Sequence, residues 1–163
     1  MALTKTAKID IGISADNRQA IANILNRILS DEFVLYTKTR KFHWNVKGIH
    51  FHDLHLFFES QYNQLAEIMD AVAERIRKIG HYSLGTLQQF LKETDLLEHV
   101  DDGSSAEIMV EALLEDHETI IKEIRQVLDP IEEKHKDAGT ADFLTGIMEQ
   151  HETMAWMLRS ILQ

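Results

Sequence analysis

The chain has 163 residues, of which 44% are hydrophobic and 27% charged, so it is long enough for one domain with a substantial core. It contains no cysteine, which excludes disulfides, thiolate metal sites and a cysteine nucleophile. The formal net charge of −10 disfavours general binding to nucleic acids or anionic lipids, and no segment reads as a signal peptide or membrane span, so we expect a cytoplasmic protein.

Helix breakers are scarce, with one proline and seven glycines, which favours long helices over a turn-rich fold. Residues 1–15 lack periodicity, and we expect a flexible tail followed by a single domain over residues 16–163. Apolar residues at spacings of three and four predict a first helix over residues 17–46 and a second over residues 53–79. Gly48 and Gly80 follow these segments as plausible stops.

A third long helix is predicted to begin near Ser105, which is a good N-cap residue, and to be kinked or ended by Pro130. A fourth spans residues 141–162. The connection over residues 81–104 is long for a bundle, and its apolar residues have helical spacing, which predicts a short extra helix there. The predicted fold is therefore all-α: a ferritin-like four-helix bundle with a short extra helix in the crossover between helices two and three.

The second predicted helix carries two pairs of possible metal ligands, His55 with Glu59 and Asp70 with Glu74. Residues four apart share a helix face, and here that face points away from the apolar stripe. A solvated surface is the simpler interpretation for any one of these residues. Glu59 and Asp70 are separated by about 16 Å along the helix axis, so one chain cannot bring both pairs to one small ion.

The two pairs are symmetric about a point between residues 64 and 65. An antiparallel copy of this helix across a twofold axis would therefore bring His55 and Glu59 next to Asp70 and Glu74 of the partner. His43, near the end of the first helix, is close enough to join them. Two histidines and three carboxylates form a mixed nitrogen and oxygen set that suits iron, with zinc or manganese as competitors.

Three runs of sequence resemble the Dps family of mini-ferritins. The segment from His43-Trp44 to Gly48, followed by Leu54-His55 and Glu59, is similar to that family's first signature. Residues 69–75 are similar to its second block, and residues 140–159 to its C-terminal stretch. One departure is Glu59, where many members carry aspartate.

The resemblance implies a dodecameric shell with ferroxidase sites at its twofold interfaces. His43, His55 and Glu59 would come from one subunit, and Asp70 and Glu74 from its partner. Such a shell would oxidise Fe(II), with hydrogen peroxide preferred over oxygen, and store Fe(III) mineral, which protects the cell from oxidative stress. The implied metal is iron, with zinc as a possible competitor.

Three further residues receive roles from the same resemblance, each beside a structural alternative. Trp44 would take up stray oxidising equivalents, or else be a buried packing residue. Asp137 and Asp142 match acidic residues that line the threefold pores through which iron enters, or else serve as an N-cap or first-turn acid. His151 lies on the apolar stripe of the last helix, and we expect a core histidine with one hydrogen bond.

Two other functions compete with iron storage. One is a nucleoid-associated, DNA-protecting protein with secondary iron chemistry. The predicted tail offers only Lys5 and Lys8 against Asp10, so we expect DNA binding to be weak or absent. The other is a helical interaction module, which would be a monomer or dimer without metal-dependent activity.

Overall fold

The computed structural model describes residues 9–163, and within them every regular element is helical. The elements are α1 (Ala15–Asn45), α2 (Phe51–Lys78), α3 (Leu87–Glu93), α4 (Ala106–Asp129), a one-turn π-helix η1 (Pro130–Lys134) and α5 (Ala138–Ile161). This order confirms the predicted fold class, including the short helix in the long crossover. Residues 1–8 of the predicted tail, with Lys5 and Lys8, lie outside the described residues.

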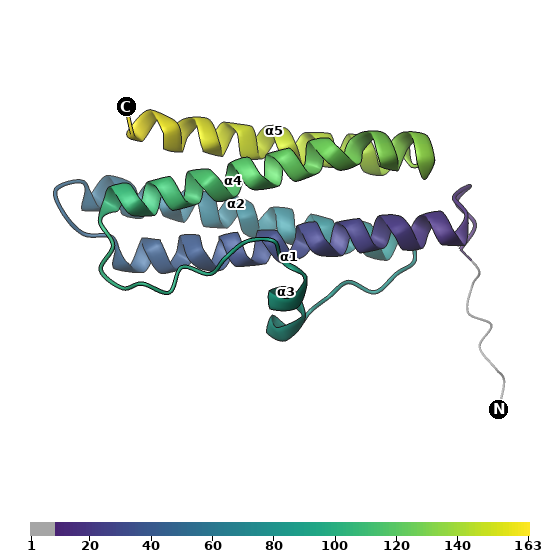
Figure 1. Ribbon diagram of the computed structural model, residues 1–163, viewed down its shortest axis with the longest axis horizontal. Coiled ribbons are helices and arrows are strands. Elements are labelled where there is room, and N and C mark those ends of the chain that lie inside the picture. Colours follow the sequence, from purple (N-terminus) through teal and green to yellow (C-terminus); the bar gives the residue numbers. More distant parts are fainter. Residues whose placement is uncertain (1–8) are drawn as a thin grey trace.

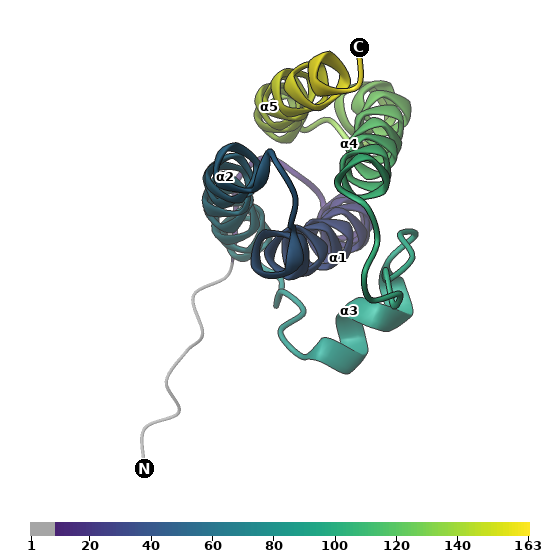
Figure 2. The same ribbon diagram turned by 90° about the vertical axis from the view of Figure 1, so that its left-hand side faces the viewer.

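The four long helices form a bundle in two antiparallel pairs, with α1 beside α2 and α4 beside α5 (Figures 1 and 2). The crossover from α2 to α4 runs along the outside of α1 and carries α3, which packs against α1 (Figure 2). A single continuous apolar core fills the space between the long helices. The crossover therefore lies on the surface of the bundle, and its helix α3 packs against α1 on the side away from α2 (Figure 2).

The predicted helix boundaries follow from local capping. Ser105 is the N-cap of α4, and its side chain accepts a hydrogen bond from the backbone N–H of Ile108 at 3.3 Å. Gly48 and Gly80 have φ values of 111° and 94°, which turn the chain after α1 and after α2. The side chain of Ile9 lies directly against Gly80, where a Cβ atom would overlap it.

Pro130 ends α4 as predicted, but the chain does not leave the bundle there. It continues through the π-helical turn, in which Ile131 is fully buried, and enters α5 after Lys136, whose φ is 60°. The buried isoleucine keeps this end of the core closed between the two helices. No helix among residues 9–163 combines the length and apolar character needed to cross a bilayer.

Candidate metal centre

The turn between α1 and α2 brings His43 and His55 together. Nδ1 of His43 lies 2.7 Å from the backbone oxygen of His55, and Nδ1 of His55 lies 2.8 Å from the backbone oxygen of His43. The two rings stack at 3.8 Å between centroids with an interplanar angle of 18°. This reciprocal arrangement holds both imidazoles in defined orientations.

The same hydrogen bonds decide which nitrogen of each ring is available to a metal. A carbonyl oxygen can only accept, so both Nδ1 atoms must carry the hydrogen. In the neutral rings both Nε2 atoms then keep a lone pair. Metal-binding histidines commonly show this pattern, with one nitrogen donating to a carbonyl and the other binding the ion.

Tyr62 connects this histidine pair to Glu59. Its hydroxyl donates to Oε1 of Glu59 at 3.2 Å, and its ring meets that of His43 edge-on at 5.2 Å. Burial, followed by the charge of Glu59, raises the pKa of the Tyr62 hydroxyl, so it remains a donor at neutral pH. His43, His55 and Glu59 thus belong to one local group, and Tyr62 is a member that the sequence patterns did not suggest.

Asp70 and Glu74 do not reach this group within one protomer. Both are exposed on α2, and Glu74 forms an ion pair with Lys78 at 3.1 Å on the surface. The helical rise separates Glu59 from Asp70 by about 16 Å. One chain therefore pairs His43 with His55 and links Glu59 to them through Tyr62, although the ligand atoms of these three residues do not all lie within 4.8 Å of one another. Asp70 and Glu74 stay on the outer surface of the same helix.

Trp44 is 64% exposed, so its alternative role as a buried packing residue within the protomer is wrong. The guanidinium of Arg40 lies 5.3 Å from the centre of its ring and 4.7 Å from that of Tyr62. The indole thus stands at the edge of the histidine group, next to a cation.

Asp137 and Asp142 prove to be different kinds of residue. Asp137 is buried and is the N-cap of α5: its carboxylate accepts from the backbone N–H of Thr140 at 2.9 Å and pairs with Arg75 at 3.0 Å. With both oxygens engaged, Asp137 is a structural residue, and a pore role no longer follows for it. Asp142 is exposed and lies beyond the first turn of α5, so the N-cap and first-turn alternatives for it are wrong.

Inside the bundle lies a chain of buried polar side chains, of which only His151 is predicted from the sequence. His151 is a core histidine as predicted, but it makes two hydrogen bonds, through Nε2 to Glu32 at 2.8 Å and through Nδ1 to Nδ1 of His117 at 2.9 Å. Burial and the neighbouring His151 hold the pKa of His117 well below its ordinary value. In the sequence, the only indication of this buried chain is Glu32, an acidic residue on the apolar stripe of α1.

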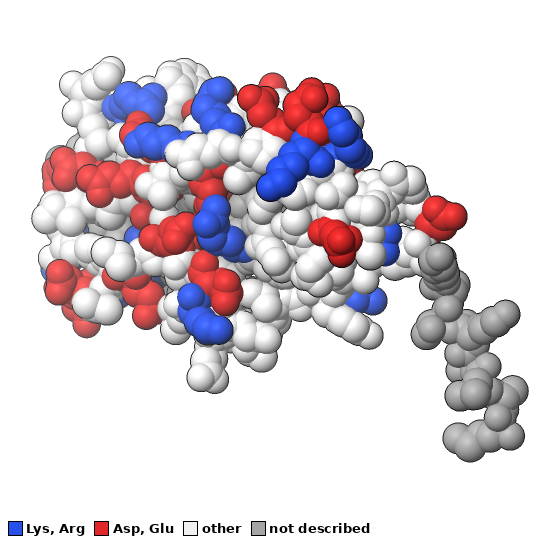
Figure 3. Space-filling view, turned by 45° about the vertical axis from the view of Figure 1, so that its right-hand side comes forward, with Lys and Arg blue, Asp and Glu red and all other residues white. Residues whose placement is uncertain are grey.

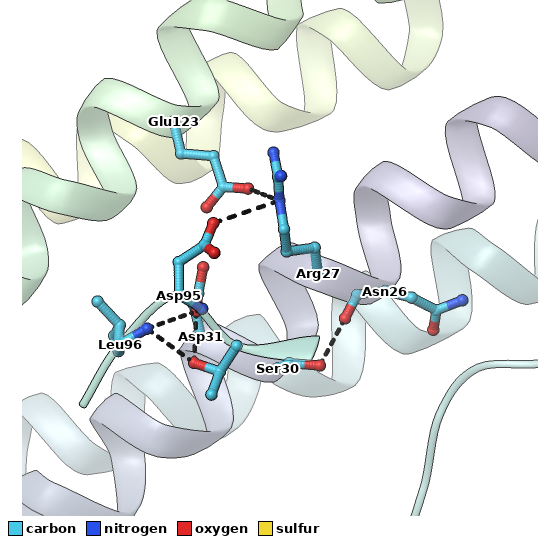
Figure 4. A network of polar contacts seen from close by, with 8 residues as sticks. Asn26, Arg27, Ser30, Asp31, Asp95, Leu96 and Glu123 are labelled. Atoms are coloured by element: carbon cyan, nitrogen blue, oxygen red, sulfur yellow. Dashed lines mark hydrogen bonds and ion pairs between the residues drawn. The ribbon is translucent and has the colours of Figure 1, made fainter. Parts of the chain in front are cut away.

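A second polar cluster lies where α1, the crossover and α4 meet (Figure 4). It contains the carboxylates of Asp31, Asp95 and Glu123, with Arg27 beside them. No sequence pattern indicated it, since its members come from three segments far apart in the chain. It is separate from the histidine group.

Comparison with known proteins places this geometry in a family. The ferritin-like domain matches residues 22–163. An uncharacterized low temperature-induced protein of Nostoc sp. is 45% identical over 156 residues, covering 96% of this chain and 87% of the relative. DNA protection during starvation protein 2 of Bacillus anthracis is 39% identical over 146 residues, covering 90% and 98%.

A solved structure gives the same result for the fold. The Dps protein from Vibrio cholerae O1, described as a member of a broad superfamily of ferritin-like diiron-carboxylate proteins, superposes with a TM-score of 0.89 at 28% identity, covering 99% of this chain and 100% of that one. Motifs, helix order and these similarities over nearly the whole chain agree. The chain therefore belongs to the Dps family of ferritin-like proteins.

Proposed function

We propose that the protein is a ferroxidase and iron store whose metal site is completed between two protomers. The observation that carries this proposal is the reciprocal pair of His43 and His55, which leaves both Nε2 atoms free. A histidine pair held in this way is suited to bind a metal ion. Membership of a ferritin-like family makes iron the expected ion.

The missing ligands would come from a second copy of α2. Asp70 and Glu74 are exposed, and an antiparallel partner helix crossing near residues 64 and 65 would bring them to the histidine group. The same symmetry would form a second, identical site. Each site would then contain two histidines from one protomer and carboxylates from both, and this set also admits zinc as a competitor.

In this proposal iron is the substrate. Two Fe(II) ions each give one electron to hydrogen peroxide, which takes up two protons and is reduced to two water molecules. The hard carboxylates of Glu59, Asp70 and Glu74 favour the Fe(III) product over Fe(II). Two-electron reduction of peroxide avoids free hydroxyl radical, and Trp44 would intercept oxidising equivalents that escape. Asp142, exposed on α5, remains available to line a pore through which iron enters.

The exposed apolar side chains support assembly into a shell. Trp44, Phe51 and Leu56 are exposed near the histidine group, and Leu87 and Leu97 are exposed on the crossover, whose helix packs against α1. Large apolar residues in such numbers are typical of surfaces that a partner covers. We propose a dodecamer, in which twelve chains of 18.8 kDa give a mass of about 226 kDa. In size-exclusion chromatography, a monomeric or dimeric interaction module would elute at a far smaller apparent mass.

DNA protection is the second proposed function, favoured by the name of the Bacillus anthracis relative. Against it stands the net charge of −10 per chain. On the face drawn in Figure 3, acidic and basic side chains are interspersed without a continuous basic area. We therefore expect weak or no DNA binding at physiological salt. We propose a cytoplasmic location, and association with the nucleoid would accompany the second function. A robust, salt-sensitive gel shift of plasmid DNA near neutral pH would favour the second function.

Anaerobic loading with Fe(II), followed by a pulse of hydrogen peroxide, tests the iron chemistry directly. We expect wild-type protein to consume about one peroxide per two Fe(II), and the double variant His43→Ala with Asp70→Ala to lose most of the initial rate. Glu67→Gln removes an exposed carboxylate of the same helix and serves as the control. Oxidation by the double variant at the wild-type rate would show that the assigned site is wrong.

A further inference from the structure

The carboxylate cluster between α1, the crossover and α4 has oxygen atoms without partners. Oδ1 of Asp31 accepts from the hydroxyl of Thr94 at 2.5 Å and from the backbone N–H groups of Asp95 and Leu96 at 2.7 and 3.3 Å. Oδ2 of Asp31 has no hydrogen-bond partner, although the residue is fully buried. Figure 4 shows this carboxylate facing the other two across the junction of the three segments.

Glu123 repeats this pattern on the opposite side. Oε1 accepts from Nε of Arg27, whereas Oε2 is buried without a partner, and the residue is 7% exposed. Asp95 is exposed, with one oxygen 3.6 Å from the same Nε atom. A buried carboxylate oxygen without a partner is costly, so two of them facing each other call for a bound positive species.

The charges point to the same conclusion. Three carboxylates against the single guanidinium of Arg27 leave a formal excess of two negative charges. Burial, with the proximity of Asp31, raises the pKa of Glu123 to about 8, against the opposing effect of Arg27. A proton shared between Asp31 and Glu123 is therefore one way to relieve the repulsion, and a divalent cation is the other.

The spacing discriminates between cations. One oxygen from each of the three carboxylates lies within 4.8 Å of the other two, so a single point exists within about 2.8 Å of all three, near the 2.3–2.6 Å of Ca²⁺–oxygen bonds. An octahedral Mg²⁺ ion binds oxygen at about 2.1 Å, so the three carboxylates would have to move farther inward to coordinate it. Since Asp95 is exposed, water can complete the coordination.

We propose that Asp31, Asp95 and Glu123 form a binding site for a hard divalent cation of the size of Ca²⁺, distinct from the histidine-containing iron site. An ion there would add a polar link between the crossover, α1 and α4, which already pack together through apolar side chains such as Phe90 and Leu96. The all-oxygen ligand set separates the two sites chemically, because histidine is a poor ligand for Ca²⁺.

Equilibrium dialysis of the metal-free, full-length protein against ⁴⁵Ca²⁺ at about 150 mM KCl tests the proposal, with salt suppressing loose binding to the acidic surface. We expect about one Ca²⁺ per protomer in wild type and its loss in Glu123→Gln. Glu115→Gln, an exposed residue of the same helix, is the matched control and should bind as wild type does. Equal uptake by wild type and Glu123→Gln would overturn the proposal.

Thermal unfolding gives a second readout. Ca²⁺ at a hundredfold excess over its Kd should raise the Tm of wild type by about 5–10 °C and leave that of Glu123→Gln unchanged. Without Ca²⁺, Glu123→Gln should be at least as stable as wild type, because its amide imitates a protonated carboxyl. Asp95→Asn changes an exposed loop residue and should also lose the ion, so the test does not depend on one variant folding. If Ca²⁺ stabilises neither wild type nor the Glu115→Gln control, the cluster holds a shared proton only.

Discussion

Division of the iron site between two protomers can be tested by mixing two defective chains. His43→Ala removes a ligand from the histidine side, and Asp70→Ala removes one from the side assigned to the partner. Each variant alone should oxidise Fe(II) at a low basal rate. A site in the mixture is intact only if its histidine side comes from the Asp70→Ala chain and its carboxylate side from the His43→Ala chain. With equal, random assembly, this holds for about a quarter of the sites.

The assay is the initial rate of Fe(II) oxidation by peroxide, measured on co-expressed chains whose equal content is checked by intact mass. We expect about a quarter of the wild-type rate above the basal rate of the separate variants. The matched control mixes His43→Ala with His55→Ala. Both defects then lie on the same side of the site, and no combination restores it. If mixed assemblies of the first pair show only the basal rate, the site is not shared between protomers and the symmetry argument fails.

Three further predictions concern single residues. Burial and the neighbouring His151 hold the pKa of His117 well below 6.5, so the unfolded chain binds a proton there at a higher pH than the folded chain does. The free energy of unfolding is therefore highest well above pH 6.5 and falls as the pH drops through and below 6.5. Guanidinium unfolding should show this loss reduced in His117→Gln and unchanged in the exposed-residue control His52→Gln; equal pH slopes in all three proteins would contradict it. Asp137→Ala removes the N-cap of α5 and the partner of Arg75, so the free energy of unfolding measured by chemical denaturation should fall by about 2–3 kcal/mol. Asp137→Asn keeps the cap and should lose less stability. Equal losses in the two variants would argue against the capping role. Trp44→Phe should keep the initial rate of Fe(II) oxidation within about twofold of wild type. It should abolish the oxidation of the indole that mass spectrometry is expected to detect in wild type after turnover with peroxide. If wild type is oxidised abundantly at other residues and not at Trp44, the proposed role is contradicted.

Much of the fold and part of the candidate metal centre could be predicted from the sequence because both depend on short-range geometry. An apolar residue every three or four positions defines the buried face of a helix wherever that helix lies, and Ser105, Gly48 and Gly80 act on their own immediate backbone. The pairing of His55 with Glu59 is likewise a property of one helical turn.

Contacts between distant segments were decided by the tertiary structure alone. The exchange of hydrogen bonds between His43 and His55 depends on how the turn between α1 and α2 closes. The meeting of Asp31 with Glu123 depends on how α4 lies against α1. The periodicity of a helix specifies which side faces the core but not which residue of another helix stands opposite, because that depends on how the packed side chains set the helices' relative positions.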